Sequence, residues 1–500
     1  MSKLYVPERF RGRTGYHIFV DRYRRSEKEI PFVEGRTIKS WNDAMPDWWP
    51  GQDGVYRNLY FYGGNLEGIT EKLDYIAELG VNLLYLSPIS KTVSNHHYDV
   101  EEQTEIDPYI GTWEDFSFFC KEAHERDMLV CVDLIFNHMG DNSYFFKKAL
   151  AGDAKYRNWF VWDSRGSPIG WYGFKDMPET NKLSTEFQEY ACNVTEKYIK
   201  HGADGIRYDL GEIIPREFLL EQQKRIKSLD KETLTVSEMW DFAIKRGNPQ
   251  LYDGQVNSLM NYPLLDAILR WVRYGNYLHF NSCMNFLAKY PLEVQNILWN
   301  HLDTHDTPRA ITMLAGEGML ENPMAGKIFD IEAPWRVQNG FDTFGFRKYS
   351  AEHDKVLQKN AIPMLKIAEL ILYLMPGIPI VFYGTEVGLS GYKDPFNRKP
   401  YPWQHENKEL RQYFIGLGQM RNNNVDVLKD GFCYTDANER LLEITRTSRD
   451  GIIVAYINRT DTQQPIYTPY ASTLGAKQIF QINGGNTQFL PPYGATVLRF

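Results

Sequence analysis

Short runs of β-branched and aliphatic residues recur along the first four-fifths of the chain, and most show little alternation between apolar and polar positions. Strands that are buried on both faces have this pattern, which is typical of parallel sheets. Stretches with apolar residues at helical spacing, such as Asn65–Leu79, Glu186–His201 and Glu217–Leu229, separate most of the runs. The succession predicts an α/β fold, a (β/α)8 TIM barrel. The predicted strands are Gly15–Val20, Val81–Pro88, Leu129–Phe136, Ala203–Tyr208, Leu234–Ser237, Gln255–Met260, Ile297–Leu302 and Pro379–Tyr383.

Three parts of the chain depart from plain βα units. His138–Ser184 follows the third strand and is rich in Trp, Gly and Asp, which predicts an inserted subdomain. After Arg421 the pattern changes to short strands separated by turns (Leu441–Thr445, Ile452–Asn458, Gln478–Ile482, Thr496–Phe500), which predicts a C-terminal antiparallel β-domain with a sandwich architecture. We therefore divide the chain into barrel residues 1–138, an inserted subdomain at 139–184, barrel residues 185–421 and a C-terminal domain at 422–500.

The third departure is the Gly316–Glu352 segment, which follows the seventh strand and is long for a βα connection. It contains several aromatic residues and lies at the end of the barrel where catalytic groups are expected. We hypothesise that this segment covers a cleft and limits the substrates that enter it to the ends of polymers or to short oligomers. The alternative is that it packs against the flank of the barrel.

The composition disfavours several classes of binding partner and indicates the cellular compartment. Lys and Arg number 56 against 64 Asp and Glu, and no long basic run occurs, so a nucleic-acid partner is not expected. The longest apolar run, Leu370–Tyr383, is interrupted by Pro376, which argues against a membrane span. The five cysteines are widely spaced without a CxxC pair, which disfavours a disulfide framework or a zinc site. Met1–Arg25 lacks an apolar signal core, so we expect a cytoplasmic protein.

Polar residues stand at the ends of four predicted strands, where reactive side chains of such barrels gather. Each residue alone could cap a helix or pair with a neighbour, but all four ends are polar in one barrel. The four ends are Asp133 to His138, Arg207 to Asp209, Ser237 to Trp240 and His301 to Asp306.

The chemistry of two of these strand ends suits glycoside cleavage. Arg207 and Asp209 are two residues apart on a strand and share a face, so the guanidinium would keep the carboxylate ionised, as a nucleophile requires. Glu238 is followed by the apolar Met239 and Trp240, and an apolar wall raises a carboxyl pKa and suits a general acid. A separation of about 5–5.5 Å between the two carboxyls would give retention and a wider one inversion, and the sequence leaves both open.

These blocks, in this order, resemble the α-amylase family of glycoside hydrolases (GH13). Blocks outside the four strand ends agree: Gly63–Ile69 before the first helix, Met177–Asn181 in the insertion and Gly377–Glu386 at the eighth strand. The resemblance runs from about Tyr16 to Arg421 and extends to the C-terminal β-domain. Within the family, the sequence most resembles the neopullulanase, cyclomaltodextrinase and maltogenic amylase group.

The resemblance implies roles for named residues. Asp209 would be the nucleophile, Glu238 the acid and base, and Asp306 a third carboxylate that holds sugar hydroxyls. The other implied roles are Arg207 orienting Asp209, His138 and His305 binding hydroxyls, Tyr98 stacking under the same sugar, Asp133 supporting the site, and Asp394 with Arg398 binding the next sugar or forming a surface ion pair.

The same resemblance has departures. Glu212 and Ile213 stand where the family commonly has Lys-His or a small residue and Glu, which leaves the division between hydrolysis and transfer open. The loop after Asp21 lacks the residues of a family calcium site, and Asn137 is a weak candidate ligand of a second one. We expect no required cofactor, with calcium as the open alternative. The segment Trp41–Tyr56 has no family counterpart, and the starch-binding N-terminal domain of cyclomaltodextrinases is missing, so we expect a different oligomer of unknown state.

We weigh three functions on these grounds. The first is a retaining hydrolase that cleaves α-1,4 bonds of maltodextrins, with cyclomaltodextrins or pullulan as further substrates. The second is a transglucosylase or isomerase, which products longer than the substrate would reveal. The third is a non-catalytic carbohydrate-binding or interaction protein, and its signature would be a missing carboxylate. Asp209, Glu238 and Asp306 are all present, which argues against the third.

Overall fold

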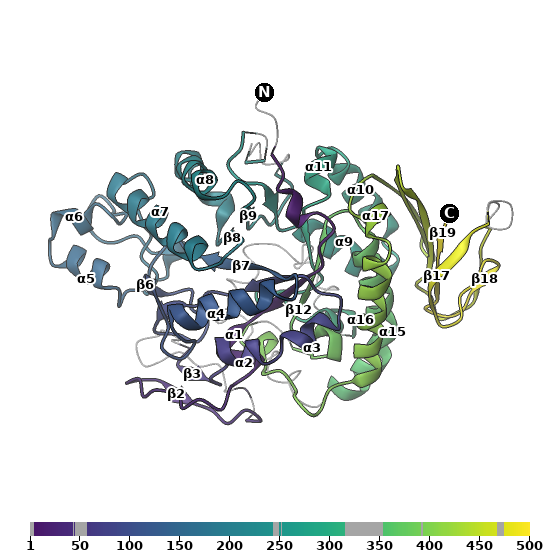
Figure 1. Ribbon diagram of the computed structural model, residues 1–500, viewed down its shortest axis with the longest axis horizontal. Helices are drawn as coiled ribbons and strands as arrows, with labels where there is room; N and C mark the ends of the chain where they lie inside the picture. The colour runs from purple at the N-terminus through teal and green to yellow at the C-terminus, as the bar shows by residue number, and fades with distance from the viewer. Residues whose placement is uncertain are drawn as a thin grey trace.

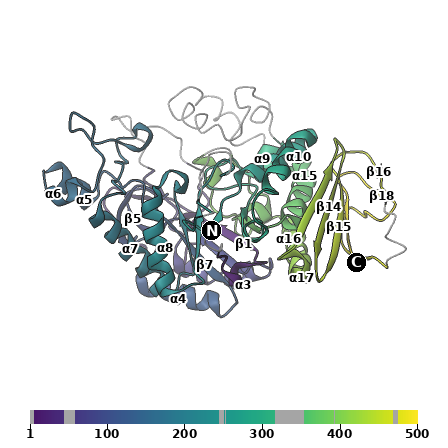
Figure 2. The same cartoon turned by 90° about the horizontal axis from the view of Figure 1, so that it is seen from above.

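The computed structural model describes residues 5–43, 45, 58–243, 250–251, 253–315, 354–391, 394–467 and 475–500, and the side chains among these except those of 354–360. The Gly316–Glu352 segment and most of Trp41–Tyr56, with Trp48 and Trp49, lie outside these residues. In Figures 1 and 2 the barrel occupies the centre, the insertion that carries α5 and α6 lies at one end, and the C-terminal strands lie at the other.

The central sheet has eight parallel strands in the order β10-β9-β8-β7-β4-β1-β12-β11. A parallel bridge between Met260 and Trp299 joins the last strand to the first, so the sheet closes on itself. The strands are buried along their length, as their continuous apolar pattern requires, and the predicted barrel is confirmed. Their bounds are β1 Gly15–Ile18, β4 Leu83–Leu86, β7 Leu129–Leu134, β8 Gly205–Tyr208, β9 Leu234–Ser237, β10 Ser258–Leu259, β11 Trp299–Asn300 and β12 Ile378–Phe382.

Helices surround the barrel, and two of the three helices predicted from the sequence match the structure. The predicted helix Asn65–Leu79 is two short helices, because Lys72 has non-helical dihedrals between them. The other two predictions match α7 and α8 to within one residue at each end. The helix bounds are α1 Val20–Tyr23, α2 Leu66–Thr70, α3 Leu73–Ala77, α4 Trp113–His124, α5 Tyr144–Leu150, α6 Ala154–Arg157, α7 Thr185–Lys200, α8 Arg216–Leu229, α9 Tyr262–Tyr274, α10 Tyr277–Leu287, α11 Leu292–Gln295, α12 Ala310–Ala315, α15 Asp354–Leu374, α16 Lys408–Asn422 and α17 Val425–Leu428, with 3-10 turns η1 Glu8–Phe10, η2 Trp171–Gly173, η3 Gly211–Ile213, η6 Thr385–Val387 and η7 Phe396–Arg398.

The segment between β7 and α7 forms the predicted insertion. It contains α5, α6 and η2, and isolated antiparallel bridges tie it together, including His138 to Glu179 and Gly170 to Pro178. Phe145 and Trp159 pack in its small aromatic core, with ring centres 4.9 Å apart and 40° between the planes. Near its base lies the hairpin of β5 Ser90–Thr92 and β6 Val100–Ile106, whose loop carries Tyr98. Two further short strands pair in parallel, β2 Thr37–Ile38 and β3 Tyr60–Phe61.

The C-terminal region is the predicted antiparallel β-domain. A five-stranded sheet in the order β13-β14-β15-β19-β17 accompanies the two-stranded β16–β18 sheet. Arg446 on β14 is fully buried, and its guanidinium donates to the carbonyls of Leu374 at the end of α15 (2.8 Å) and Leu428 in α17 (3.0 Å). It therefore joins this sheet to the barrel helices. The strands are β13 Phe432–Ala437, β14 Leu441–Ser448, β15 Gly451–Asn458, β16 Gln464–Pro465, β17 Lys477–Ile482, β18 Phe489–Leu490 and β19 Ala495–Arg499. Of these, β13, β16 and β18 are not among the strands that the sequence predicts.

Over the residues that the structure describes, no helix combines the length and the apolar character that crossing a membrane requires.

Candidate active site

One buried guanidinium gathers the carboxylates at the mouth of the barrel. Arg207 Nη1 lies 2.8 Å from Asp133 Oδ2 and 3.0 Å from Asp209 Oδ1, while its Nη2 lies 2.8 Å from Glu238 Oε2. Asp133 comes from β7, Arg207 from β8, and Glu238 directly follows β9. Parallel neighbouring strands place these ends side by side, which is why residues up to 105 positions apart in the sequence share one cation. The side chain of Arg207 is fully buried.

Two further donors fix Glu238. The backbone N–H of Leu210 donates to Oε2 at 2.7 Å, and the indole N–H of Trp240 donates to Oε1 at 2.7 Å. Leu210 has a left-handed backbone, with φ near 50°, which turns the chain sharply after Asp209. Trp240 stacks on Tyr262 with ring centres 4.0 Å apart and 7° between the planes. The sequence predicts Trp240 as an apolar wall beside Glu238, and in the structure the indole also supplies a hydrogen bond.

Burial and mutual repulsion dominate the charge state of the cluster. Burial raises the pKa of Asp209 well above its usual range, the charge of Glu238 adds to the rise, and Arg207 opposes it. Burial, with a further contribution from Glu238, raises the pKa of Asp306 to about 7. Three carboxylates share the single guanidinium, so Arg207 favours the ionised form of Asp209 while burial and the charge of Glu238 oppose it. Carboxyls this close to one another titrate as a group rather than one by one.

Tyr98 lies at the centre of the same site. Its hydroxyl donates to Asp133 Oδ2 at 2.9 Å and lies 2.5 Å from His305 Nε2. The rings of Tyr98 and His305 stack 5.1 Å apart, with 7° between their planes. His305 Nε2 is also 3.1 Å from Asp306 Oδ2. The structure thus brings Tyr98, His305 and Asp306 together beside the Arg207 cluster, as the sequence predicted.

His138 connects the barrel to the insertion. Its Nε2 lies 3.1 Å from the carbonyl oxygen of Tyr98, and its ring stacks on Trp171 at 5.2 Å with 19° between the planes. Burial lowers the pKa of His138 to about 3, so the imidazole is neutral at ordinary pH. Trp171 was not predicted as a site residue, and the only signal in the sequence was the high tryptophan content of the insertion.

Asp394 and Arg398 also face the site. Arg398 Nη1 lies 3.0 Å from Asp394 Oδ1, and its Nη2 lies 3.5 Å from Asp306 Oδ1. Its Nε donates to the carbonyl of His305 at 2.9 Å. The side chain of Arg398 is 6% exposed, so the pair adjoins Asp306 instead of lying on open surface.

Asn137, the weak metal candidate, already has a cation beside it. The ammonium of Lys182 donates to Asn137 Oδ1 at 3.0 Å. With Lys182 in this position the donor set around Asn137 does not accommodate a divalent ion, because two cations would share the same oxygens. Among the described residues, no three His, Cys, Asp or Glu side chains are grouped to hold a metal. The calcium alternative thus stays a prediction.

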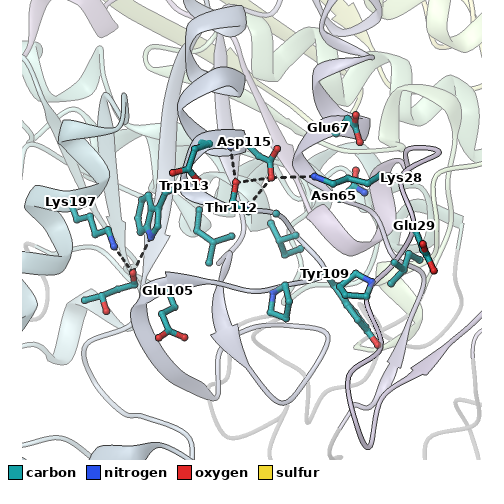
Figure 3. A pocket seen from close by; sticks show the side chains of 18 residues that line it. Lys28, Glu29, Asn65, Glu67, Glu105, Tyr109, Thr112, Trp113, Asp115 and Lys197 are labelled. Atoms are coloured by element: carbon teal, nitrogen blue, oxygen red, sulfur yellow. Dashed lines mark hydrogen bonds and ion pairs between the residues drawn. The ribbon is translucent and has the colours of Figure 1, made fainter.

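A cavity of about 620 Å³ elsewhere on the barrel, at the N-terminus of α4, contains none of the predicted site residues (Figure 3). Trp113 and Lys197 line it, and both donate to the carbonyl of Thr104, at 3.0 and 2.8 Å. The indole of Trp113 is packed against Tyr198 and lies under the Lys197 ammonium, so it offers no free face for a sugar.

Comparison with known proteins identifies relatives. The family described as "Alpha amylase, catalytic domain" matches residues 7–330. Neopullulanase 2 of Thermoactinomyces vulgaris is 27% identical over 480 residues, which is 92% of this chain and 72% of that protein. An amylopullulanase of Thermoanaerobacter thermohydrosulfuricus is 26% identical over 86% of this chain, but the chain spans only 31% of its length. The cyclic alpha-maltosyl-(1→6)-maltose hydrolase of Arthrobacter globiformis has the same fold, with a TM-score of 0.79 and 23% identity over 99% of this chain and 100% of that one.

Proposed function

The chain belongs to the alpha-amylase family, and on that premise we propose that it is a retaining α-glucan hydrolase that cleaves α-1,4-glucosidic bonds of maltodextrins. The observation that carries the proposal is the arrangement of Asp209 and Glu238 on the two nitrogens of one guanidinium. Two carboxyls that share one guanidinium are neighbours, and a covalent glycosyl-enzyme requires two neighbouring carboxyls, typically about 5–5.5 Å apart.

The reaction has two displacements. Asp209 attacks the anomeric carbon while Glu238 gives its proton to the departing glycosidic oxygen, so the glycosidic bond breaks as an ester to Asp209 forms. Glu238 then takes a proton from water, and the hydroxyl oxygen displaces Asp209. The first displacement requires a protonated Glu238 and an ionised Asp209. Arg207 lies within reach of both groups.

The surrounding residues bind the sugar. Asp306 accepts hydroxyl hydrogen bonds and stabilises positive charge in the transition state, and neutral His138 and His305 bind hydroxyls beside it. Tyr98 forms the apolar floor under the same ring, and its hydroxyl is fixed by Asp133. Asp394 and Arg398 bind the next sugar toward the non-reducing end, since their ion pair adjoins Asp306.

We further propose a cytoplasmic location and a glucan partner of short or cyclic chains. The five cysteines form no disulfide among the described residues, and the four at positions 120, 131, 192 and 283 are buried, which fits a reducing compartment. Because relatives are named neopullulanase and cyclomaltodextrinase, pullulan and cyclomaltodextrins are the first candidate substrates after maltodextrins.

The test uses purified protein with maltoheptaose and β-cyclodextrin, and the Asp209→Asn variant as the blank. We expect shorter maltodextrins and, by NMR during the first turnovers, the α-anomer. An initial β-anomer would overturn retention. Products longer than seven glucose units would show that the main reaction is transfer and not hydrolysis.

A further inference from the structure

The ammonium of Lys182 is surrounded by oxygens. Its Nζ lies 3.0 Å from Asn137 Oδ1, 3.1 Å from the carbonyl of Thr180, 3.2 Å from Glu179 Oε1 and 3.4 Å from the carbonyl of Asn137. The Lys182 side chain is 6% exposed, and Asn137 is fully buried. An ammonium has three N–H groups, so these oxygens more than satisfy it.

These oxygens have the chemistry of a calcium site. Two main-chain carbonyls, an amide oxygen and a carboxylate are hard oxygen ligands of the kind that Ca²⁺ takes at about 2.3–2.6 Å. The observed separations of 3.0–3.4 Å are those of a hydrogen-bonded nitrogen. Burial lowers the pKa of Lys182, and Glu179 opposes this as the charged partner.

The oxygens come from two different parts of the fold. Asn137 lies just beyond β7, next to His138, while Glu179, Thr180 and Lys182 belong to the end of the insertion. Backbone hydrogen bonds run alongside, from Thr180 N–H to the Asn137 carbonyl at 3.0 Å and from Met139 N–H to the Pro178 carbonyl at 3.1 Å. The cation therefore holds the insertion against the strand end that presents His138 to the site.

We propose that the Lys182 ammonium is a built-in replacement for a divalent cation, which fixes the insertion to the barrel and positions His138 without a metal. Lys182 is thus a positioning residue that acts through Asn137. Two consequences follow from the geometry. The protein as it exists is indifferent to calcium at this place, and removal of the side chain opens a cation-sized space that is lined by the same oxygens.

The experiment compares the thermal midpoint of the full chain, Lys182→Ala and Lys182→Met in 5 mM EDTA and in 10 mM CaCl2. We expect the parent midpoint to be equal in both. The midpoint of Lys182→Ala falls by about 5 °C in EDTA, since the hydrogen bonds of a buried ammonium and its half-buried partner Glu179 are lost, and recovers at least half of the loss in calcium. The midpoint of Lys182→Met also falls in EDTA, but calcium does not restore it, because the methionine side chain fills the space that the ion would occupy. Terbium luminescence should appear with Lys182→Ala and be absent with Lys182→Met.

Kinetics separate positioning from general destabilisation. Below the melting range we expect Lys182→Ala to raise KM for maltoheptaose about tenfold in EDTA, with a smaller change in kcat, and calcium to restore KM. The matched control is Lys148→Ala, because Lys148 is exposed on α5 of the same insertion. We expect it to change neither midpoint nor KM.

Three results would overturn the proposal: a parent midpoint that falls in EDTA, a Lys182→Ala midpoint equal to that of the parent, or a Lys182→Ala loss that calcium does not reduce. If Lys182→Ala is insoluble, it is expressed with and without added calcium. Soluble protein that depends on calcium supports the proposal, and insolubility in both overturns it. None of these readouts requires the proposed activity.

Discussion

Two fully buried arginines, Arg207 and Arg446, illustrate two uses of an internal charge. Arg207 faces three carboxylates, whose negative charges more than offset its burial and raise its pKa well above the usual range. Arg446 faces main-chain carbonyls, and burial lowers its pKa. The first environment has surplus negative charge that chemistry can use. The second has none, and the guanidinium serves to hold a sheet against helices.

The largest effect is expected from the carboxylates of the Arg207 cluster. Asp209→Asn or Glu238→Gln should reduce kcat on maltoheptaose by at least about 10³-fold, because each removes a bond-forming or proton-transferring group. Circular dichroism should show an unchanged fold. Asp436→Asn, at an exposed position on β13, is the matched control and should retain full activity. More than a few per cent of parent activity in either site variant would contradict the assigned roles.

Exchanging the two arginines for methionine sharpens the comparison directly. Arg207→Met should lower kcat about 10²-fold or more, because the carboxylates lose their shared counterion. Arg446→Met should leave kcat unchanged but lower the free energy of unfolding by about 2–4 kcal/mol, since several buried carbonyls lose their donor. Denaturant unfolding and steady-state kinetics on both variants check this. An activity loss in Arg446→Met at a temperature where it is folded would break the distinction.

A smaller effect is expected at Trp240. Trp240→Phe keeps a ring to stack on Tyr262 and removes the N–H that donates to Glu238. We expect kcat to fall about tenfold with KM nearly unchanged, because one hydrogen bond that orients the acid is lost. Trp162→Phe is the control, since it also removes one indole hydrogen bond, to the Arg157 carbonyl, but far from the cluster. Equal kinetics for Trp240→Phe and the parent would contradict this role.

The smallest effect concerns pH and stability. The pKa of Asp306 is raised to about 7 in the fold, whereas an unfolded aspartate titrates near 3.8, so between these values the native state binds more protons than the unfolded state. The contribution of this carboxyl to the free energy of unfolding is therefore greatest at low pH and is lost as the pH rises toward 7. The thermal midpoint of Asp306→Asn should be a few degrees higher than that of the parent at pH 8 and almost the same at pH 4. A gain that is the same at both pH values would show that the carboxyl is not the cause.

Sequence patterns predicted the parts of this molecule that depend on local order. The apolar runs located all eight barrel strands, and the strand-end rule gathered Asp133, Arg207 and Glu238 correctly. The missed features are hydrogen bonds of single side chains, which neither the apolar pattern nor the strand-end rule describes. Trp240 looks apolar in sequence, and its hydrogen bond to Glu238 exists only because both follow the same strand into a shared turn. Lys182 reads as one lysine among many until the insertion folds back onto Asn137.

The barrel also has a seam. The strands on either side of it, β10 and β11, are two residues long and meet through the Met260–Trp299 bridge, whereas β7 and β8 pair with their neighbours over four residues on both sides. Local opening should begin where the fewest backbone hydrogen bonds must break. Deuterium should therefore enter the amides of β10 and β11 well before those of β7 and β8. The ring can open at its seam while the strands that carry Asp133 and Arg207 stay closed.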